Sequence, residues 1–226
     1  MFKGITTLLL DMNSTFMFGE DRFGENSDYS EYYKLIGGTL SPSSVNSIIQ
    51  KVLEYLGDRY PEKEYLEKFP SVRDAIDATC FKRLADEEIE KIIETFAFHE
   101  HGHIPKEYIE ALEQLQKKYQ LAAVVDIWAP KDMWLQTFKQ LGIDELFSAL
   151  SFSSDHGIVK PSPKPFEMVM SELKVHPKEC LVIGDSVRRD LGGALAAGID
   201  CILVNNATDN RALASFKNLI DVSEVA

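Results

Sequence analysis

The chain has 226 residues, 45 % of them hydrophobic, and its 24 Lys and Arg against 36 Asp and Glu give a formal net charge of −12. A chain of this length and composition can bury a large core, as one domain with an insertion or as two domains. Its acidic surface would repel a polyanion, which disfavours nucleic acid as a partner but allows a local basic pocket that binds one phosphate.

The first predicted element is a strand from Ile5 to Leu10. Asp11 follows it directly, and Asn13, Ser14 and Thr15 form a polar turn. Ligands of open α/β sheets bind outside the carboxyl ends of the strands, so a carboxylate placed here is a candidate for chemistry. The alternative is that Asp11 only caps a following helix.

The start of the chain and its cysteines bear on where the protein works. Only three consecutive leucines precede Asp11, too few for a signal-peptide core or a membrane span, and we expect a cytoplasmic protein without a membrane partner. Cys80, Cys180 and Cys201 form no CxxC motif. They predict buried reduced thiols, not a disulfide framework or a zinc site.

The stretch after Thr15 predicts a loop and then a helical insertion. Residues 16–32 carry glycines, acids and aromatics without a period, which is typical of a loop. Ser41 and Pro42 then begin a helix, and the apolar residues from Val45 to Leu56 recur at helical spacing. Two more helices are predicted, at 72–84 and 86–98. Residues 24–98 therefore predict a small helical bundle without strands.

The second half of the chain alternates helices and strands. This order predicts a parallel sheet with helices on both faces, joined by the first strand, so that the bundle is inserted after that strand. Helices are predicted from Pro105, from Pro130 to Gly142, at 165–173 and over the small-residue run GGALAAG, and strands or apolar segments at 121–125, 146–152, 180–183 and 199–204.

Polar residues follow four of these predicted strands or segments and would converge at one edge of the sheet. They include acids after three of the strands and a single lysine, which is what a hard cation and a phosphate require. Mg²⁺ takes oxygen ligands, and lysine offers a compact positive charge to phosphate oxygens. The residues are Asp11, Asn13, Asp126, Lys160, Asp185, Ser186 and Asp190.

In their order and spacing, DMNST, the strand ending near Asp126, GIVKPSPKPF and CLVIGDSVRRDLGGALAAGI closely resemble the haloacid dehalogenase superfamily of Asp-nucleophile hydrolases and phosphotransferases. The resemblance covers residues 1 to about 20 and about 104 to 205. It implies an α/β fold, a Rossmann-like parallel-sheet core with an inserted α-helical cap domain. We place the core at 1–18 and 103–226 and the cap at 19–102.

The resemblance also implies a role for each residue. Asp11 would attack phosphorus and become a phospho-aspartate. Asp11, the carbonyl of Asn13 and Asp185 would hold Mg²⁺. Lys160 would neutralise Asp11 and the phosphoryl group, and Asp190 would orient Lys160 or a water on the metal. The candidate substrate-binding residues, Asp126 included, are completed by Thr15 and Ser186.

Two positions depart from the family pattern. Phosphatases of the family have an acid/base Asp where this chain has Asn13, and losing such a group costs on the order of 10²- to 10⁴-fold in rate. The family usually has Ser or Thr where this chain has Asp126, and a carboxylate there would repel a phosphate oxygen. Asp126 must then be protonated, turned away, paired with a cation such as Lys131, or placed where no phosphate binds. A protonated Asp126 could take over part of the missing acid role; the alternative is that it pairs or caps the helix from Pro130.

Two further clusters admit more than one interpretation. His99, His101 and His103 would share one face of an extended segment at the cap-to-core linker, where they could bind a metal, form a pH-sensitive hinge or be plain surface histidines. An aromatic cluster would pack the cap on the core or line a substrate pocket. Its members are Phe16, Phe18, Phe23, Tyr29, Tyr32 and Tyr33.

The leading functional prediction is a Mg²⁺-dependent phosphatase for a small phosphorylated metabolite that the cap encloses. One alternative is a hydrolase of carbon–halogen bonds from the dehalogenase branch, which uses an Asp nucleophile without a metal. The other is a weak or inactive scaffold that binds a phosphorylated ligand or a protein, suggested by Asn13 and Asp126 together. The sequence indicates neither the substrate nor the oligomeric state.

Overall fold

The computed structural model describes residues 2–24, 27–80 and 84–226. Its centre is a six-stranded parallel sheet in the order β3-β2-β1-β4-β5-β6. This is the predicted α/β fold. The strands are β1 (Thr7–Leu10), β2 (Gln120–Val125), β3 (Phe147–Phe152), β4 (Cys180–Gly184), β5 (Asp200–Leu203) and β6 (Ala214–Ser215).

Strand β1 lies in the middle of the sheet and is buried on both faces. It pairs with β2 on one side and β4 on the other, with Leu10 level with Ala123 and Ile183. Leu8 and Leu10 contribute to one apolar cluster, and Leu9 to the cluster on the opposite face. A continuous apolar run is the pattern expected of a strand covered on both faces. The sheet order also changes direction at β1, which makes its carboxyl end a switch point where ligands bind.

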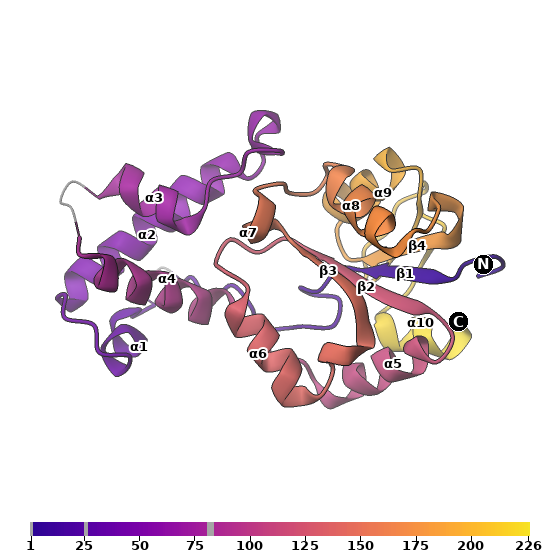
Figure 1. The fold of residues 1–226 in the computed structure, drawn as a ribbon, viewed down its shortest axis with the longest axis horizontal. Coiled ribbons are helices and arrows are strands. Elements are labelled where there is room, and N and C mark those ends of the chain that lie inside the picture. The colour runs from indigo at the N-terminus through magenta and orange to yellow at the C-terminus, as the bar shows by residue number, and fades with distance from the viewer. Residues whose placement is uncertain (1, 25–26, 81–83) are drawn as a thin grey trace.

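Helices cover both faces of the sheet (Figure 1). α5 (Lys106–Gln116), α6 (Asp132–Leu141) and α10 (Leu219–Val225) supply apolar residues to the cluster of Leu8 and Leu10. α8 (Lys164–Leu173) and α9 (Gly192–Ala196) pack on the other face, against Leu9. The short α7 (Ser153–His156) follows β3. This is the helix–sheet–helix layering that the alternating pattern predicts.

A group of helices lies beyond the carboxyl ends of the strands, to the left of the sheet in Figure 1. It consists of α1 (Ser30–Leu35), α2 (Pro42–Arg59), α3 (Val72–Thr79) and α4 (Asp86–Glu100), which contact one another. α2 begins as predicted, because Ser41 Oγ accepts the N–H of Ser44 and Pro42 occupies the first turn. No strand occurs among the described residues between 24 and 98.

Several boundaries differ from the predictions. Helix α1 begins within the stretch 16–32 that was expected to be a loop: its first turn is fixed by the Asp28 side chain, and Tyr33 is buried. The helix expected from Pro130 begins at Asp132. Strand β6 and helix α10 were not predicted. The expected helix 72–84 ends at Thr79 among the described residues, and its residues 81–83 lie outside them, as do residues 25 and 26 of the expected loop and bundle.

Two chain-wide expectations can be compared with the structure. Cys80, Cys180 and Cys201 are all free thiols; Cys180 and Cys201 are buried as expected, whereas Cys80 is only half-buried. None of the described helices combines the length and the apolar character needed to cross a lipid bilayer.

Candidate active site

The site lies at the carboxyl ends of the three central strands. Asp11 follows β1, Asp185 follows β4 and Asp126 follows β2. The backbone N–H of Asp11 donates to the carbonyl of Ile183 at 2.9 Å, which continues the β1–β4 ladder one residue beyond the strand. Because the strands are parallel and in register, three carboxylates that are far apart in sequence are delivered to one edge.

Lys160 joins the acids into one buried network. Its Nζ donates to Asp11 Oδ1 at 2.7 Å, to Asp190 Oδ1 at 2.6 Å and to the carbonyl of Val124 at 3.0 Å. The Lys160 side chain is 2 % exposed and that of Asp190 1 %. A buried ammonium is tolerated only when it is paired and hydrogen-bonded, and here all three of its donors are used.

Electrostatics favour a charged lysine in this network. Burial alone would lower the pKa of Lys160, but Asp11 and Asp190 raise it above its usual value. Burial and the charge of Asp190 raise the pKa of Asp11 to about 7, against the lowering effect of Lys160. A single cation therefore stabilises a pair of carboxylates that would otherwise repel each other.

The turn after β4 fixes Asp185 and Asp190. Ser186 Oγ accepts the N–H of Arg189, and the N–H of Ser186 donates to Asp190 Oδ2 at 2.9 Å, so a π-helical turn forms at Val187–Leu191. A β-carbon on Gly184 would lie 2.4 Å from Asp190 Cγ. Glycine before Asp185 is what allows the Asp190 carboxylate to lie against the end of the strand.

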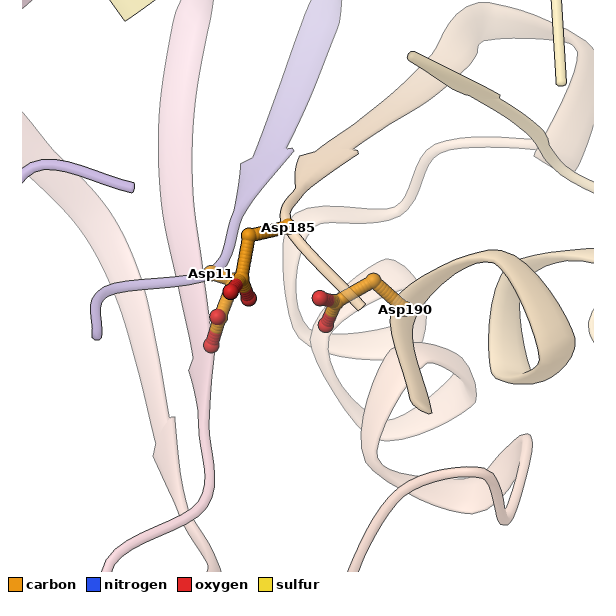
Figure 2. A group of neighbouring side chains, drawn as sticks. All are labelled: Asp11, Asp185 and Asp190. Carbon is orange, nitrogen blue, oxygen red and sulfur yellow. The ribbon is translucent and has the colours of Figure 1, made fainter. Parts of the chain in front are cut away.

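Three carboxylates meet closely enough to hold a cation. Ligand oxygens of Asp11, Asp185 and Asp190 lie within 4.8 Å of one another, and Figure 2 shows the three side chains around one point. Both oxygens of Asp190 already accept hydrogen bonds from the protein, so Asp11 and Asp185 are the better metal ligands. An all-oxygen set with one or two carboxylates is what Mg²⁺ takes, so these residues fit that ion.

The turn after Asp11 places Asn13 and Ser14 in the site. The carbonyl of Met12 accepts the N–H groups of Thr15, Phe16 and Met17, which closes a tight turn. Asn13 Oδ1 is buried and has no hydrogen-bond partner among the described residues. A buried acceptor without a partner is costly unless a ligand or water supplies a donor.

These residues surround a cavity of about 430 Å³ between the sheet edge and the helical group. Its volume suits a small molecule. Tyr60, which follows α2, Leu53 within α2 and Phe23 before α1 close it from the helical side. The full lining is Asp11, Asn13, Ser14, Glu20, Asp21, Phe23, Leu53, Tyr60, Glu100, Asp126, Trp128, Lys160, Asp185 and Arg189.

Two of the roles that the sequence suggested for Asp126 are not seen in the structure. It does not cap α6, which begins at Asp132, and it does not pair with Lys131, whose Nζ bonds Asp155 at 2.6 Å. Its carboxylate instead accepts the N–H of Lys160, at 3.1 and 3.2 Å, and the hydroxyl of Tyr60 at 2.7 Å. Burial raises the pKa of Asp126. Asp126 thus holds the Lys160 loop to the sheet edge and links it to the helical group.

Thr15 and Ser186 were predicted to bind substrate, but the structure does not bring either to the cavity. Thr15 is buried in the turn beneath Asn13, and its hydroxyl finds no partner among the described residues. Ser186 uses its hydroxyl to cap the turn that carries Arg189. The Ser186 side chain thus serves the local backbone, which sequence spacing alone does not reveal.

The three linker histidines do not converge. His99 lies against the edge of the Tyr29 ring, His101 Nε2 is 3.0 Å from Thr137 Oγ1, and His103 pairs through its backbone with Phe18. Among the described residues the only group close enough for a metal is that of Asp11, Asp185 and Asp190. Burial lowers the pKa of His101 to about 4, which leaves that imidazole neutral near pH 7.

Three members of the aromatic cluster pack within the core or within the helical group, and one lines the cavity. Phe16 stacks on Phe147 in the core, Phe18 lies against Tyr108, and Tyr32 stacks on Phe98 within the helical group. Only Phe23 among the six lines the cavity.

Glu100 is a residue of the site that was not predicted; its carboxylate accepts hydrogen bonds from the N–H groups of Trp128 at 2.6 Å and Ala129 at 2.8 Å. Burial raises the pKa of Glu100 to about 8. A signal was present: Glu100 continues the buried stripe of Ile89, Ile93 and Phe96 on α4, where an acid is out of place unless it is bonded.

Comparison with known proteins shows the family to which the chain belongs. A family model described as haloacid dehalogenase-like hydrolase matches residues 39–204. The protein belongs to this family of hydrolases, which confirms the resemblance predicted from the motifs. Solved structures agree at the level of the fold: the 2-haloacid dehalogenase of Pseudomonas syringae superimposes with a TM-score of 0.65 at 22 % identity, covering 98 % of this chain and 97 % of the other.

Two curated relatives are phosphatases by name. Pyrophosphatase PpaX of Halalkalibacterium halodurans is 27 % identical over 172 residues, which cover 72 % of this chain and 76 % of that protein. Phosphoglycolate phosphatase of Yersinia pestis is 40 % identical over 62 residues, or 27 % of this chain and 26 % of that protein.

Proposed function

We propose that this protein is a Mg²⁺-dependent phosphatase that hydrolyses a small phosphorylated metabolite through a phospho-aspartate on Asp11. The observation that carries the proposal is the Lys160 network: a buried carboxylate at a strand end, bonded at 2.7 Å to a buried ammonium beside a second acid, opening into a cavity. The names of the pyrophosphatase and phosphoglycolate phosphatase relatives support phosphoryl chemistry.

Asp11, Asp185 and the backbone carbonyl of Asn13 are the residues proposed to hold Mg²⁺. When bound, the ion would offset the negative charge that a phosphoryl group meets among these acids. Both carboxylate oxygens of Asp190 already accept hydrogen bonds, from Lys160 and Ser186, so we assign Asp190 to positioning Lys160.

The reaction is proposed in two displacements. An oxygen of Asp11 attacks phosphorus, the ester P–O bond breaks, and the leaving-group oxygen departs with the bonding pair. Water then attacks the phosphorus of the phospho-aspartate, which releases inorganic phosphate and restores Asp11. Lys160 stabilises the negative charge on Asp11 and on the transferred group through both steps, because its ammonium is fixed in place before the substrate arrives.

Asn13 determines which substrates are turned over well. Its amide cannot protonate a leaving group or take a proton from water, so the leaving oxygen must depart as an anion or be protonated from elsewhere. Asp126, whose pKa is raised by burial, would be the source of that proton, although it also anchors the Lys160 loop. The enzyme is therefore expected to favour esters of acidic alcohols or other good leaving groups.

The helical group of residues 19–102 is proposed as the cap over a core of 1–18 and 103–226. It supplies Leu53 and Tyr60 to the cavity. It is also tied to the Lys160 loop, since Phe69 N–H donates to the carbonyl of Gly157 and Val159 N–H donates to that of Leu66. A cap bonded to the loop of the central lysine would select the substrate and exclude water from the site.

Carbon–halogen hydrolysis is the second candidate, because the Pseudomonas syringae enzyme with the same fold is a 2-haloacid dehalogenase. That branch works without a metal. The convergence of Asp185 and Asp190 on Asp11 favours the metal-dependent phosphatase.

The test is hydrolysis of 4-nitrophenyl phosphate with and without Mg²⁺, alongside chloride release from 2-chloropropionate. We expect Mg²⁺-dependent phosphate release, a loss of about 10³-fold or more in Asp11→Asn, and no chloride. Asp132→Asn, the same change at an exposed acid of α6, is the matched control. After a rapid acid quench, the phosphorylated peptide should be the one that contains Asp11.

Activity towards neither substrate, in the native chain and in Asn13→Asp, would leave the inactive scaffold as the better description. Metal-independent chloride release would favour the dehalogenase.

A further inference from the structure

The charges around the cavity are unevenly matched. Its lining contains several carboxyl groups and two basic side chains, Lys160 and Arg189. Lys160 is committed to Asp11 and Asp190. Among the described residues, the guanidinium of Arg189 makes no hydrogen bond and no ion pair within 4 Å. It remains the available cation of the cavity.

Arg189 is nevertheless held in place. Its backbone N–H donates to Ser186 Oγ at 3.1 Å, which fixes the start of the side chain on the turn after β4. Its guanidinium carbon lies 5.6 Å from the centre of the Tyr60 ring, within the range of a cation–π contact. A half-buried guanidinium braced by an aromatic ring, with its donors unused, is pre-organised for an oxyanion.

The position of Arg189 assigns it to the leaving-group side. The phosphoryl group belongs at Asp11, where Lys160 lies, whereas Tyr60 closes the cavity from the helical side. The substrate beyond the ester oxygen must lie towards that side, next to the Tyr60 ring and Arg189.

Asp190, Asp11 and Asp126 favour the charged form of Arg189, but none of them forms an ion pair with it among the described residues, and several acids of the cavity already accept hydrogen bonds from other groups. Asp126 accepts hydrogen bonds from the Tyr60 hydroxyl and the Lys160 backbone N–H, and Glu100 accepts hydrogen bonds from two backbone N–H groups. Ser14 Oγ donates to Glu20 at 2.9 Å. The remaining carboxyls near Arg189 are Asp185, which is proposed to hold Mg²⁺, and Asp21, whose pKa burial raises to about 6.

We propose that Arg189 binds a second anionic group of the substrate, a carboxylate or a second phosphoryl group carried on the leaving-group side. The substrate class is therefore a small phosphate ester or anhydride with two separated anions. This inference rests on the proposed phosphatase function and goes beyond it by stating what else the substrate carries.

The test uses phosphonates, which bind without being hydrolysed. Phosphonoacetate carries a carboxylate where ethylphosphonate carries a methyl group, and methylenediphosphonate carries a second phosphoryl group instead. Calorimetry in the presence of Mg²⁺ should show that one or both of the ligands with two separate anionic groups bind about 10- to 100-fold more tightly than ethylphosphonate. The stronger of the two identifies whether the second group is a carboxylate or a phosphoryl group.

The quantity compared is the ratio of the affinity for a ligand with two anionic groups to the affinity for ethylphosphonate. Arg189→Gln should reduce this ratio to near one, and Arg189→Lys should restore part of it. Arg188→Gln is the matched control, because Arg188 is exposed, donates to the carbonyl of Pro61 and does not line the cavity. It should keep the native ratio.

A native ratio near one, or a ratio that survives in Arg189→Gln, overturns the inference. So does an equal loss of affinity for all three phosphonates, which would assign Arg189 to the transferred phosphoryl group. If none of the three binds to the native protein and 4-nitrophenyl phosphate is not hydrolysed, the proposed function fails together with this inference. If ethylphosphonate binds and the second anion adds nothing, only this inference fails.

Discussion

Lys160 donates a 2.7 Å hydrogen bond to Asp11 across 149 residues of the chain, inside a site where both side chains are buried. Replacing Lys160 by Met would leave Asp11 and Asp190 as buried acids without a cation. We expect the free energy of unfolding at pH 8 to fall by about 3–5 kcal/mol. The loss should be smaller at pH 5, because protonation then removes the repulsion between the acids. Urea unfolding at both pH values measures this.

The matched control for Lys160→Met is Lys164→Met, which breaks an exposed ion pair with Glu67 and should change stability by less than about 1 kcal/mol. A loss in Lys160→Met that is equal at pH 8 and pH 5 would show that packing, and not charge, dominates.

Asn13→Asp is expected to raise phosphatase activity by about 10²-fold or more, because it restores an acid/base group where Asn13 Oδ1 is buried without a partner. The gain should be larger for alkyl phosphates than for 4-nitrophenyl phosphate, since poor leaving groups need the proton most. Steady-state rates for a series of leaving groups provide the measurement. A uniform change across the series would contradict an acid role at this position.

Local patterns predicted the central strands, the long helices and the residues at the sheet edge, because each strand is a short apolar run followed directly by a polar residue. The partners of those residues could not be predicted. Asp126 is followed closely by Lys131 in sequence, yet it bonds Tyr60 and the backbone of Lys160, which only the folded chain brings near. Helix α1 was missed for a similar reason: Tyr33 is buried against other helices, and tertiary packing outweighs its weak local signal.

Asp126→Ser should lower phosphatase activity by about tenfold or more. The shorter side chain cannot reach both the Tyr60 hydroxyl and the Lys160 N–H, so each loses its acceptor and the Lys160 loop loosens. Tyr60→Phe removes the hydroxyl alone and should have a smaller effect. Initial rates and thermal midpoints of both variants give the comparison. An increase in activity in Asp126→Ser would exclude an acid role for Asp126.

Gly184→Ala tests the close approach of Asp190 to the strand end. A methyl group there would lie 2.4 Å from Asp190 Cγ, so the carboxylate must move away from Lys160 and from the N–H of Ser186. We expect a loss of about 2–4 kcal/mol in unfolding free energy and of most activity. Gly142→Ala has open space for its methyl and introduces strain only at the left-handed position that ends α6, so it should keep activity. Equal activity in the two variants would show that the Asp190 position is not required.

The buried carboxyl group of Glu100 should make the stability of the protein depend on pH. Burial raises its pKa in the folded protein to about 8 from an ordinary value of 4.5, with the charge of Asp21 acting in the same direction, so between these values the folded state binds the extra proton. Stability from this group is complete below pH 4.5 and is lost as pH rises through 8. Glu100→Gln cannot ionise, so its unfolding free energy should fall less steeply between pH 5 and 8 than that of the native chain. Glu87→Gln, an exposed change on the same helix, should keep the native slope. Denaturant midpoints measured across this pH range provide the test. Parallel stability curves for Glu100→Gln and the native chain would contradict the prediction. They would mean that Glu100 stays ionised across the range, because the N–H groups of Trp128 and Ala129 stabilise its charge.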